Sequence, residues 1–232
     1  MSWQPLLEGL GEAGRLLASL DLEVLELTAR SLTTAGAATL LAALAGVPLG
    51  VALGMGDFRG RGAAKTLVNA LVGVPTVTLG LFLYTLFSRN GPLGWLDLLY
   101  SVPGIVIGEA VLVTPIVASL VASAVESRDR ALGDLVRTLG ASEADTRIAV
   151  LRESWGGVSL ALVSSFNRAF AELGVAMMIG ANISGVTRVL TTAIALETAK
   201  GEMGLSFALS FILLAFVLVL NFLISRLGRM QR

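Results

Sequence analysis

Long runs without a charged residue are the feature that most restricts how this chain can fold. Residues 31–55 and 67–87 contain no Asp, Glu, Lys or Arg. A helix needs about 20 apolar residues to cross the roughly 30 Å hydrocarbon core of a bilayer. Because only 15% of the 232 residues are charged and 55% are hydrophobic, we predict an all-α integral membrane protein with a single domain, residues 1–232.

About five transmembrane helices are predicted from the apolar runs of the chain, two of which contain charged residues. Their ranges are Ser31–Met55, Leu67–Phe87, Val102–Val125, Trp155–Gly180 and Leu205–Leu223. Ahead of the first run, residues 5–20 place leucines among charged residues, which predicts an N-terminal amphipathic helix lying on membrane lipid. Residues 181–203 contain only a short apolar patch, Val189–Leu196. This segment is predicted to be either a re-entrant element or an external loop.

The distribution of Lys and Arg predicts the orientation in the membrane. The segments after the first, third and fifth runs hold more of these residues than the opposite side. They are Arg59, Arg61, Lys65, Arg128, Arg130, Arg137, Arg147, Arg152, Arg226, Arg229 and Arg232. The opposite side holds Arg15, Arg30, Arg89, Arg188 and Lys200. We therefore expect the N-terminus outside and the C-terminus in the cytoplasm.

Residue types that are absent exclude several function classes. The chain has no His and no Cys, so it cannot form a Ser–His dyad or a Cys/His metal site. An intramembrane hydrolase is therefore disfavoured, and we predict no catalytic residue, no metal and no enzyme activity. Lys and Arg are not gathered into a basic stripe, so the sequence does not indicate a nucleic-acid partner. The segment 60–66 lacks the glycine that precedes lysine in a phosphate-binding loop, so no nucleotide site is predicted.

The longest loop on the predicted cytoplasmic side, residues 126–153, carries the most informative motif. Asp134 is followed by Arg137-Thr-Leu-Gly140-Ala141-Ser142 and then by Glu143. A helix, a turn permitted by glycine and a second short helix make a stiff protrusion. On loop chemistry alone, a solvated helical hairpin without a partner fits equally well. The sequence of residues 134–143 resembles the EAA loop of type I ABC importer permeases. Arg152-Glu153 replaces the Leu-Pro that this family has after the loop.

The resemblance extends over most of the chain and narrows the family. Gly73-Val74-Pro75 and the stretch 88–94 resemble molybdate and tungstate permeases. The stretches 180–194 and 196–201 resemble the tungstate-uptake branch of that family in particular. The resemblance implies a type I ABC importer transmembrane domain in a prokaryotic cytoplasmic (inner) membrane. It implies an oxyanion substrate, tungstate before molybdate or sulfate. On hydropathy alone, an ion-driven carrier or a channel remains open.

The resemblance also implies an assembly. Its members are a homodimer of this chain, two cytoplasmic ATPase subunits and an external oxyanion-binding protein. ATP and Mg would act on the ATPase subunits, with no cofactor in this chain. Asp134, Arg137, Gly140, Ala141, Ser142 and Glu143 would then couple to the ATPase.

Two further sets of polar residues are candidates for the translocation pathway or its gate. Asn167, Arg168 and Glu172 interrupt the fourth run, and the spacing of Arg168 and Glu172 allows an intrahelical ion pair. Such a pair fits a structural lock on the helix as well as a pathway role. In residues 181–203, the side chains of Asn182, Arg188 and Thr191 are neutral or cationic donors suited to a dianion at an external gate. A plain hydrophilic loop would have a similar composition.

Overall fold

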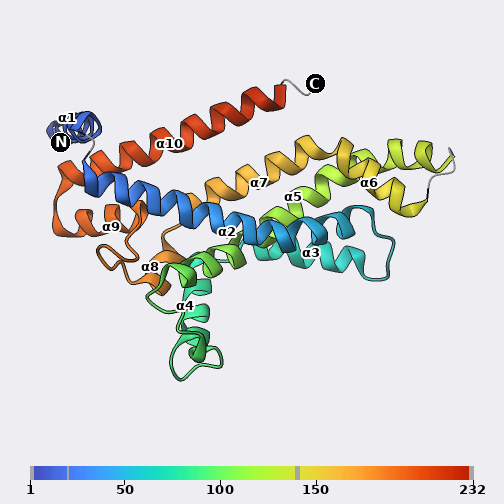
Figure 1. Ribbon diagram of the computed structural model, residues 1–232, viewed down its shortest axis with the longest axis horizontal. Helices are drawn as coiled ribbons and strands as arrows, with labels where there is room; N and C mark the ends of the chain where they lie inside the picture. Colours follow the sequence, from blue (N-terminus) through green and yellow to red (C-terminus); the bar gives the residue numbers. More distant parts are fainter. Residues whose placement is uncertain (1–2, 20, 139–141, 230–232) are drawn as a thin grey trace. The chain divides into compact units, whose positions relative to one another are not determined.

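The structure is a computed structural model that describes residues 3–19, 21–138 and 142–229. The described residues form helices and no strand. In chain order, they are α1 (Gln4–Ser19), α2 (Leu22–Met55), α3 (Arg61–Val72), α4 (Thr76–Phe87), the 3₁₀ helix η1 (Gly94–Leu96), α5 (Val102–Thr138), α6 (Glu143–Glu153), α7 (Trp155–Phe170), α8 (Gly174–Gly180), α9 (Leu190–Lys200) and α10 (Met203–Arg229). Figure 1 traces them along the chain. The predicted all-α class is confirmed.

The spans follow the uncharged runs, with two interruptions. Three helical stretches are long and apolar enough to cross a membrane: Leu22–Met55, Val102–Ser127 and Met203–Phe222. The pairs α3 with α4 and α7 with α8 raise the number to five if each pair crosses as one span. Each pair is broken by a few residues, at 73–75 and at 171–173. The sequence predicts continuous helices there, so the two breaks are corrections to that prediction.

The chain divides into two compact units, each assembled from distant parts of the sequence. Unit 1 comprises Met1–Ala37, Pro75–Glu109 and Phe170–Leu223. Unit 2 comprises Ala38–Val74, Ala110–Ala169 and Ile224–Arg232. The predicted amphipathic helix is present in unit 1 as α1. Trp3 precedes it, and Leu7 and Leu10 on α1 are exposed.

Unit 2 is built on a close approach of α2 and α5. Gly46, Gly50 and Gly54 recur every four residues on α2, opposite Val117, Val121 and Val125 on α5. A Cβ atom added to Gly50 would lie 2.7 Å from Val121 Cβ. Only glycine permits this separation, so the spacing brings the two helix backbones together. Leu53, Val68, Ala118 and Ala122 extend the same core to α3.

Unit 1 packs its short helices on one another through small residues. Gly80 of α4 meets Met178 of α8, and Gly174 at the start of α8 meets Thr76 of α4. α8 and the beginning of α4 are drawn side by side in Figure 1. Ile105, Ala176 and Val189 form a buried cluster that joins α5 and α8 to the start of α9. The segment that contains the predicted gate residues is thus built into this core.

Candidate functional site

The backbone around the EAA-like loop follows the expected helix, turn and helix order. Asp134 and Arg137 belong to α5, which continues to Thr138. Gly140 and Ala141 lie outside the described residues. Ser142 is the N-cap of α6, and Glu143 is its first residue.

Ser142 fixes the start of α6 with its side chain. Its Oγ accepts a hydrogen bond from the backbone N–H of Asp145 at 3.2 Å and donates one to Asp145 Oδ2 at 2.6 Å. This is the usual chemistry of an N-cap, because the first N–H groups of a helix have no partner within the helix. The hydroxyl of Thr146 donates to the Ser142 carbonyl at 3.0 Å. Ser142 therefore has a defined structural role in addition to its place in the motif.

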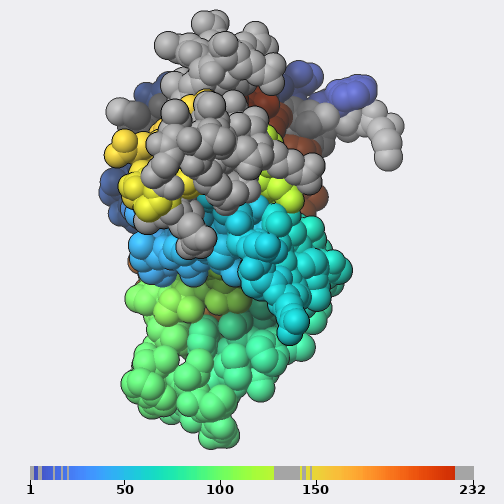
Figure 2. Space-filling view, turned by 90° about the vertical axis from the view of Figure 1, so that its right-hand side faces the viewer, coloured from blue at the N-terminus to red at the C-terminus, as the bar shows by residue number. Residues whose placement is uncertain are grey.

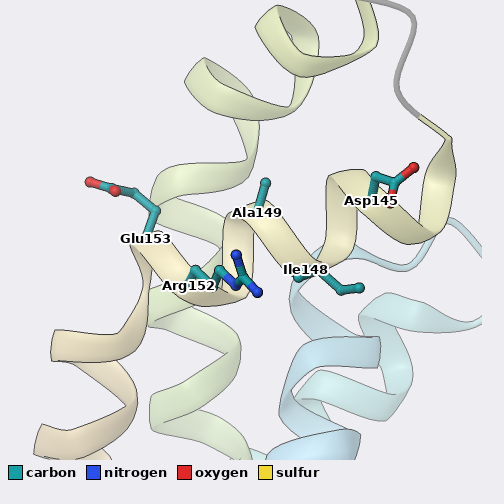
Figure 3. Close-up of a pocket in the computed structure, with 5 residues that line it drawn as sticks. All are labelled: Asp145, Ile148, Ala149, Arg152 and Glu153. Carbon is teal, nitrogen blue, oxygen red and sulfur yellow. The ribbon is translucent and has the colours of Figure 1, made fainter.

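The two faces of α6 differ sharply. Thr146 and Val150 are buried in unit 2, whereas Ile148 is 52% exposed. The exposed face borders a hollow of about 600 Å³. Its lining residues, all on α6, are Asp145, Ile148, Ala149, Arg152 and Glu153. Figure 3 shows their side chains projecting from this one helix. One exposed apolar side chain, Ile148, thus lies among acidic and basic groups on this face.

The helix that carries Arg168 ends before it reaches Glu172. α7 stops at Phe170, with the half-buried Asn167 and Arg168 in its last turn. The expectation of one continuous helix through Arg168 and Glu172 was wrong, so helical spacing does not place the two side chains on one face. Glu172 lies in the break and is only 2% exposed.

Glu172 is held by contacts to both neighbouring helices of unit 1. Its Oε1 accepts the N–H of Val175 at 3.1 Å, in the first turn of α8. Its backbone carbonyl accepts the hydroxyl of Thr191 at 2.7 Å, from α9. A carboxylate at a helix N-terminus satisfies an otherwise unpaired N–H and interacts favourably with the helix dipole. Thr191 is buried as well, so these contacts join α8 and α9.

Residues 181–188 form a tight turn around Thr187. The hydroxyl of Thr187 donates to the Gly180 carbonyl at 2.6 Å and accepts the N–H of Ile183 at 2.9 Å. Asn182 adopts a left-handed backbone conformation with φ of 55°. The short apolar patch that follows is helical and belongs to α9, which has 11 residues. That length is too short to cross a bilayer.

The first third of α2 binds this turn, a contact that the sequence did not predict. The guanidinium of Arg30 donates to the carbonyls of Arg188 at 2.9 Å and of Gly185 at 3.1 Å. Ser31 Oγ accepts the N–H of Leu190 at 2.8 Å. Arg188 itself lies 3.9 Å from the carboxylate of Glu23. The structure thus brings Asn182, Arg188 and Thr191 into one well-connected segment of unit 1.

No group of three or more His, Cys, Asp or Glu residues that could hold a metal ion occurs in the part of the chain that the structure describes. Most of the hydrogen bonds described above join a polar side chain to a backbone carbonyl or N–H group.

Comparison with known proteins identifies relatives over nearly the whole chain. Residues 46–232 match the family described as "Binding-protein-dependent transport system inner membrane component". The chain is 34% identical over 214 residues to the tungstate uptake system permease protein TupB of Peptoclostridium acidaminophilum, which covers 92% of this chain and 94% of that protein. It is 36% identical over 216 residues to a probable anion ABC transporter permease of Haloferax volcanii, with coverage of 90% and 93%.

A solved structure shows the same fold. One chain of the inward-facing MetNI methionine ABC transporter superposes with a TM-score of 0.75 at 17% identity. The match covers 92% of this chain and 98% of that chain. The expected fold of a type I ABC importer transmembrane domain is therefore confirmed.

Proposed function

Because the chain belongs to the family of binding-protein-dependent transport system inner membrane components, we propose that it is the permease subunit of a tungstate importer. The observation that supports the substrate is the 34% identity, over 92% of the chain, to a permease named for tungstate uptake. In such a transporter this chain supplies the pathway, and the free energy comes from ATP on another subunit.

The experiment that tests the substrate is uptake by the reconstituted transporter. This chain would be assembled with its ATPase and its external binding protein in vesicles, and uptake of tungstate, molybdate and sulfate would be compared. We expect ATP-dependent tungstate uptake that a tenfold excess of sulfate leaves nearly unchanged. Preferred uptake of molybdate or sulfate would replace tungstate with the second candidate, and uptake without ATP would favour an ion-driven carrier.

The proposed assembly contains two copies of this chain, two ATPase subunits and one external oxyanion-binding protein. Two-fold symmetry gives a closed pore between identical subunits. ATP and Mg belong to the ATPase subunits, because this sequence has no phosphate-binding loop. The mass of the detergent-solubilised complex measures this stoichiometry directly. A purified chain that hydrolysed ATP alone would contradict it.

The exposed face of α6 is the proposed contact with the ATPase. This assignment is supported by the exposed Ile148 and the flanking charges of Asp145 and Arg152. The EAA-like motif in residues 134–143 supports it as well. Ile148→Glu or Gly140→Pro should leave a folded, inserted permease whose ATPase no longer responds to the loaded binding protein. Ile148→Val is the matched control and should respond normally. Normal coupling in Ile148→Glu and Gly140→Pro would refute the assignment.

An N-terminus outside and a C-terminus in the cytoplasm are proposed from the Lys and Arg distribution. With this orientation, α6 is cytoplasmic, and the turn at residues 181–188 is on the outer side, where Asn182, Arg188 and Thr191 would form a gate. Asn167, Arg168 and Glu172 would lie on the pathway. Reporter fusions at Arg232 and within 126–153 should read cytoplasmic, and fusions near Asp97 and Lys200 should read external.

A further inference from the structure

One surface of unit 2 is polar at a depth where lipid would be expected. α3 has a buried side, with Ala64 and Val68 packed in the core of unit 2. Its open surface divides into two faces by helical spacing. One carries the exposed Leu67 and Leu71 and suits lipid. The other carries Gly62, Thr66, Asn69 and Gly73, spaced by four, three and four residues, all exposed. Figure 2 shows α3, in cyan, on the side turned to the viewer.

α5 continues this polar surface. Val117, Val121 and Val125 are buried, whereas Ser119 and Ser123, four residues apart on another side of the helix, are open to the surface. The two helices meet there, because the hydroxyl of Ser119 donates to Asn69 Oδ1 at 2.7 Å. We call Asn69, Ser119 and Ser123 the polar face.

An ion cluster lies one to two helical turns from Asn69 and Ser119, and less than one turn from Ser123. Glu126 of α5 accepts hydrogen bonds from Lys65 Nζ at 2.6 Å and from Arg61 at 3.2 Å. Charged groups of this kind mark the level of the membrane interface. At about 1.5 Å per residue, Asn69 lies about 6 Å along its helix from Lys65, and Ser119 about 10 Å from Glu126. Ser119 lies within the candidate span Val102–Ser127, and Asn69 lies within the bent pair of α3 with α4.

Donors on the polar face remain open. Neither Asn69 Nδ2 nor Ser123 Oγ makes a hydrogen bond to any residue that the structure describes. Hydrocarbon offers no partner to an amide or a hydroxyl, so such groups in membrane proteins face other helices or water. Leu67 and Leu71 on the other open face of α3 show that this helix also has a surface suited to lipid.

We propose that the polar face lines the aqueous translocation pathway, and that Asn69 and Ser123 donate hydrogen bonds to the passing oxyanion or to its hydration water. This proposal deepens the proposed function and rests on it for the nature of the cargo. The polar face contains no cationic group. Neutral donors hold a dianion weakly, which suits a surface that the ion must leave quickly.

Cysteine accessibility tests this assignment cleanly, because the chain contains no cysteine. Asn69→Cys and Ser123→Cys would be introduced singly into the complete transporter, with cysteine-free partner subunits, in lipid vesicles. Leu67→Cys and Leu71→Cys are the matched controls on the other open face of α3. The probe is a membrane-impermeant, negatively charged methanethiosulfonate, which reacts with the thiolate in water.

We expect Asn69→Cys and Ser123→Cys to react at least about tenfold faster than the leucine controls, since thiolate forms readily only in a polar environment. The added charged group should then block ATP-driven uptake. Equal, slow labelling of all four variants would mean that the polar face contacts lipid. Oxidative cross-linking of Ser123→Cys between two copies, without labelling, would mean that it is a dimer contact. Either result overturns the proposal.

The cysteine-labelling result tests the pathway assignment independently of the proposed tungstate substrate. Labelling rates are measured without any oxyanion, so they report on water at the polar face whatever the cargo is. A transporter that carried molybdate and rejected tungstate would refute the proposed substrate and leave the pathway assignment in place. A transporter that carried tungstate but had unreactive cysteines at Asn69 and Ser123 would support the proposed substrate and refute the pathway assignment.

Discussion

The two units of this chain hold their helices together by different means. In unit 2, α2 and α5 approach through a glycine row, Gly46, Gly50 and Gly54, against valines on the facing helix. These contacts are apolar and repeat with the helical period. In unit 1, single polar side chains reach distant backbone groups, as Arg30 does at the carbonyls of Arg188 and Gly185. The first arrangement depends on shape, and the second depends on individual hydrogen bonds.

The difference predicts how each unit responds to substitution. A close helix approach fails when volume is added, because the backbones are forced apart. A network of buried hydrogen bonds fails when one partner is removed, because the remaining group stays buried without a partner. Unit 2 should therefore be sensitive to enlargement and unit 1 to the loss of polar groups.

The largest effect is expected at Glu172 of unit 1. Glu172→Ala removes a buried carboxylate that accepts the N–H of Val175, and a hydrogen bond to a charged group is worth about 1.5 to 3 kcal/mol. We expect this variant to give little folded transporter. Glu172→Gln keeps an acceptor oxygen and should give more. The measurements are the yield of monodisperse complex and its melting temperature.

A double-mutant cycle with Arg168 tests the pair that the sequence suggested. If Arg168 and Glu172 compensate each other's charge, the double alanine variant should be more stable and more active than either single variant. Additive losses would show that they act independently. A mild Glu172→Ala would also contradict the view that polar contacts hold unit 1.

The second effect is expected at Gly50 in the glycine row. A Cβ added there would lie 2.7 Å from Val121 Cβ and 2.8 Å from the Ala118 carbonyl oxygen. Overpacking of this kind costs about 1 to 3 kcal/mol, so Gly50→Val should lower the melting temperature clearly. Gly36→Ala on the same helix is the control, because nothing lies within 4 Å of its added Cβ. Shortening Val121 to alanine should not rescue Gly50→Val, because Val121 Cβ and the Ala118 carbonyl oxygen stay in place.

The sequence predicted the parts of this fold that depend on local pattern. Apolar runs located the candidate spans. The break at residues 73–75 had a signal, since proline disfavours helix in the residue before it, and Pro75 is extended with φ of −63° and ψ of 128°. The break at Glu172 had no such signal in the sequence, and the carboxylate of Glu172 accepts the N–H of Val175 in the next helix.

The candidate site was predictable to the same extent. The EAA-like motif predicted a second short helix after the glycine turn, and α6 begins at Glu143. Arg30 and Ser31 were missed because their partners are 155 to 159 residues away in sequence. No periodicity connects such positions. Asn69 was missed for another reason: one polar residue in an apolar run carries little signal until its neighbour Ser119 is known.

A smaller effect is expected at Ser31, where unit 1 depends on one hydroxyl. Ser31 is buried and its Oγ accepts the N–H of Leu190, the first residue of α9. Ser31→Ala leaves that N–H without its partner, which costs about 1 to 3 kcal/mol. The melting temperature should fall. Hydrogen exchange at the start of α9 should accelerate. The exposed Thr33 on the next part of α2 bonds only its own helix, so Thr33→Ala should change neither quantity.

The smallest effect is expected where a polar contact of unit 1 is exposed. The hydroxyls of Tyr84 and Tyr100 lie 3.4 Å apart, and the hydrogen bond with Tyr84 raises the pKa of Tyr100 above its usual value of 10.0. A raised pKa means that the folded state favours the protonated phenol. The contact therefore contributes below the unfolded pKa, and its contribution is lost as the pH rises through the folded pKa.

Tyr84→Phe should lower the pKa of Tyr100 toward 10.0 and leave the melting temperature at neutral pH unchanged, since water replaces an exposed hydrogen bond at little cost. The chain has only two tyrosines, so selective ¹³C labelling of tyrosine in this subunit leaves one signal to titrate in the variant. The wild-type complex is the reference. A large loss of stability in Tyr84→Phe would mean that exposed polar contacts support unit 1 as strongly as the buried ones at Ser31 and Glu172, and burial would no longer separate the two classes.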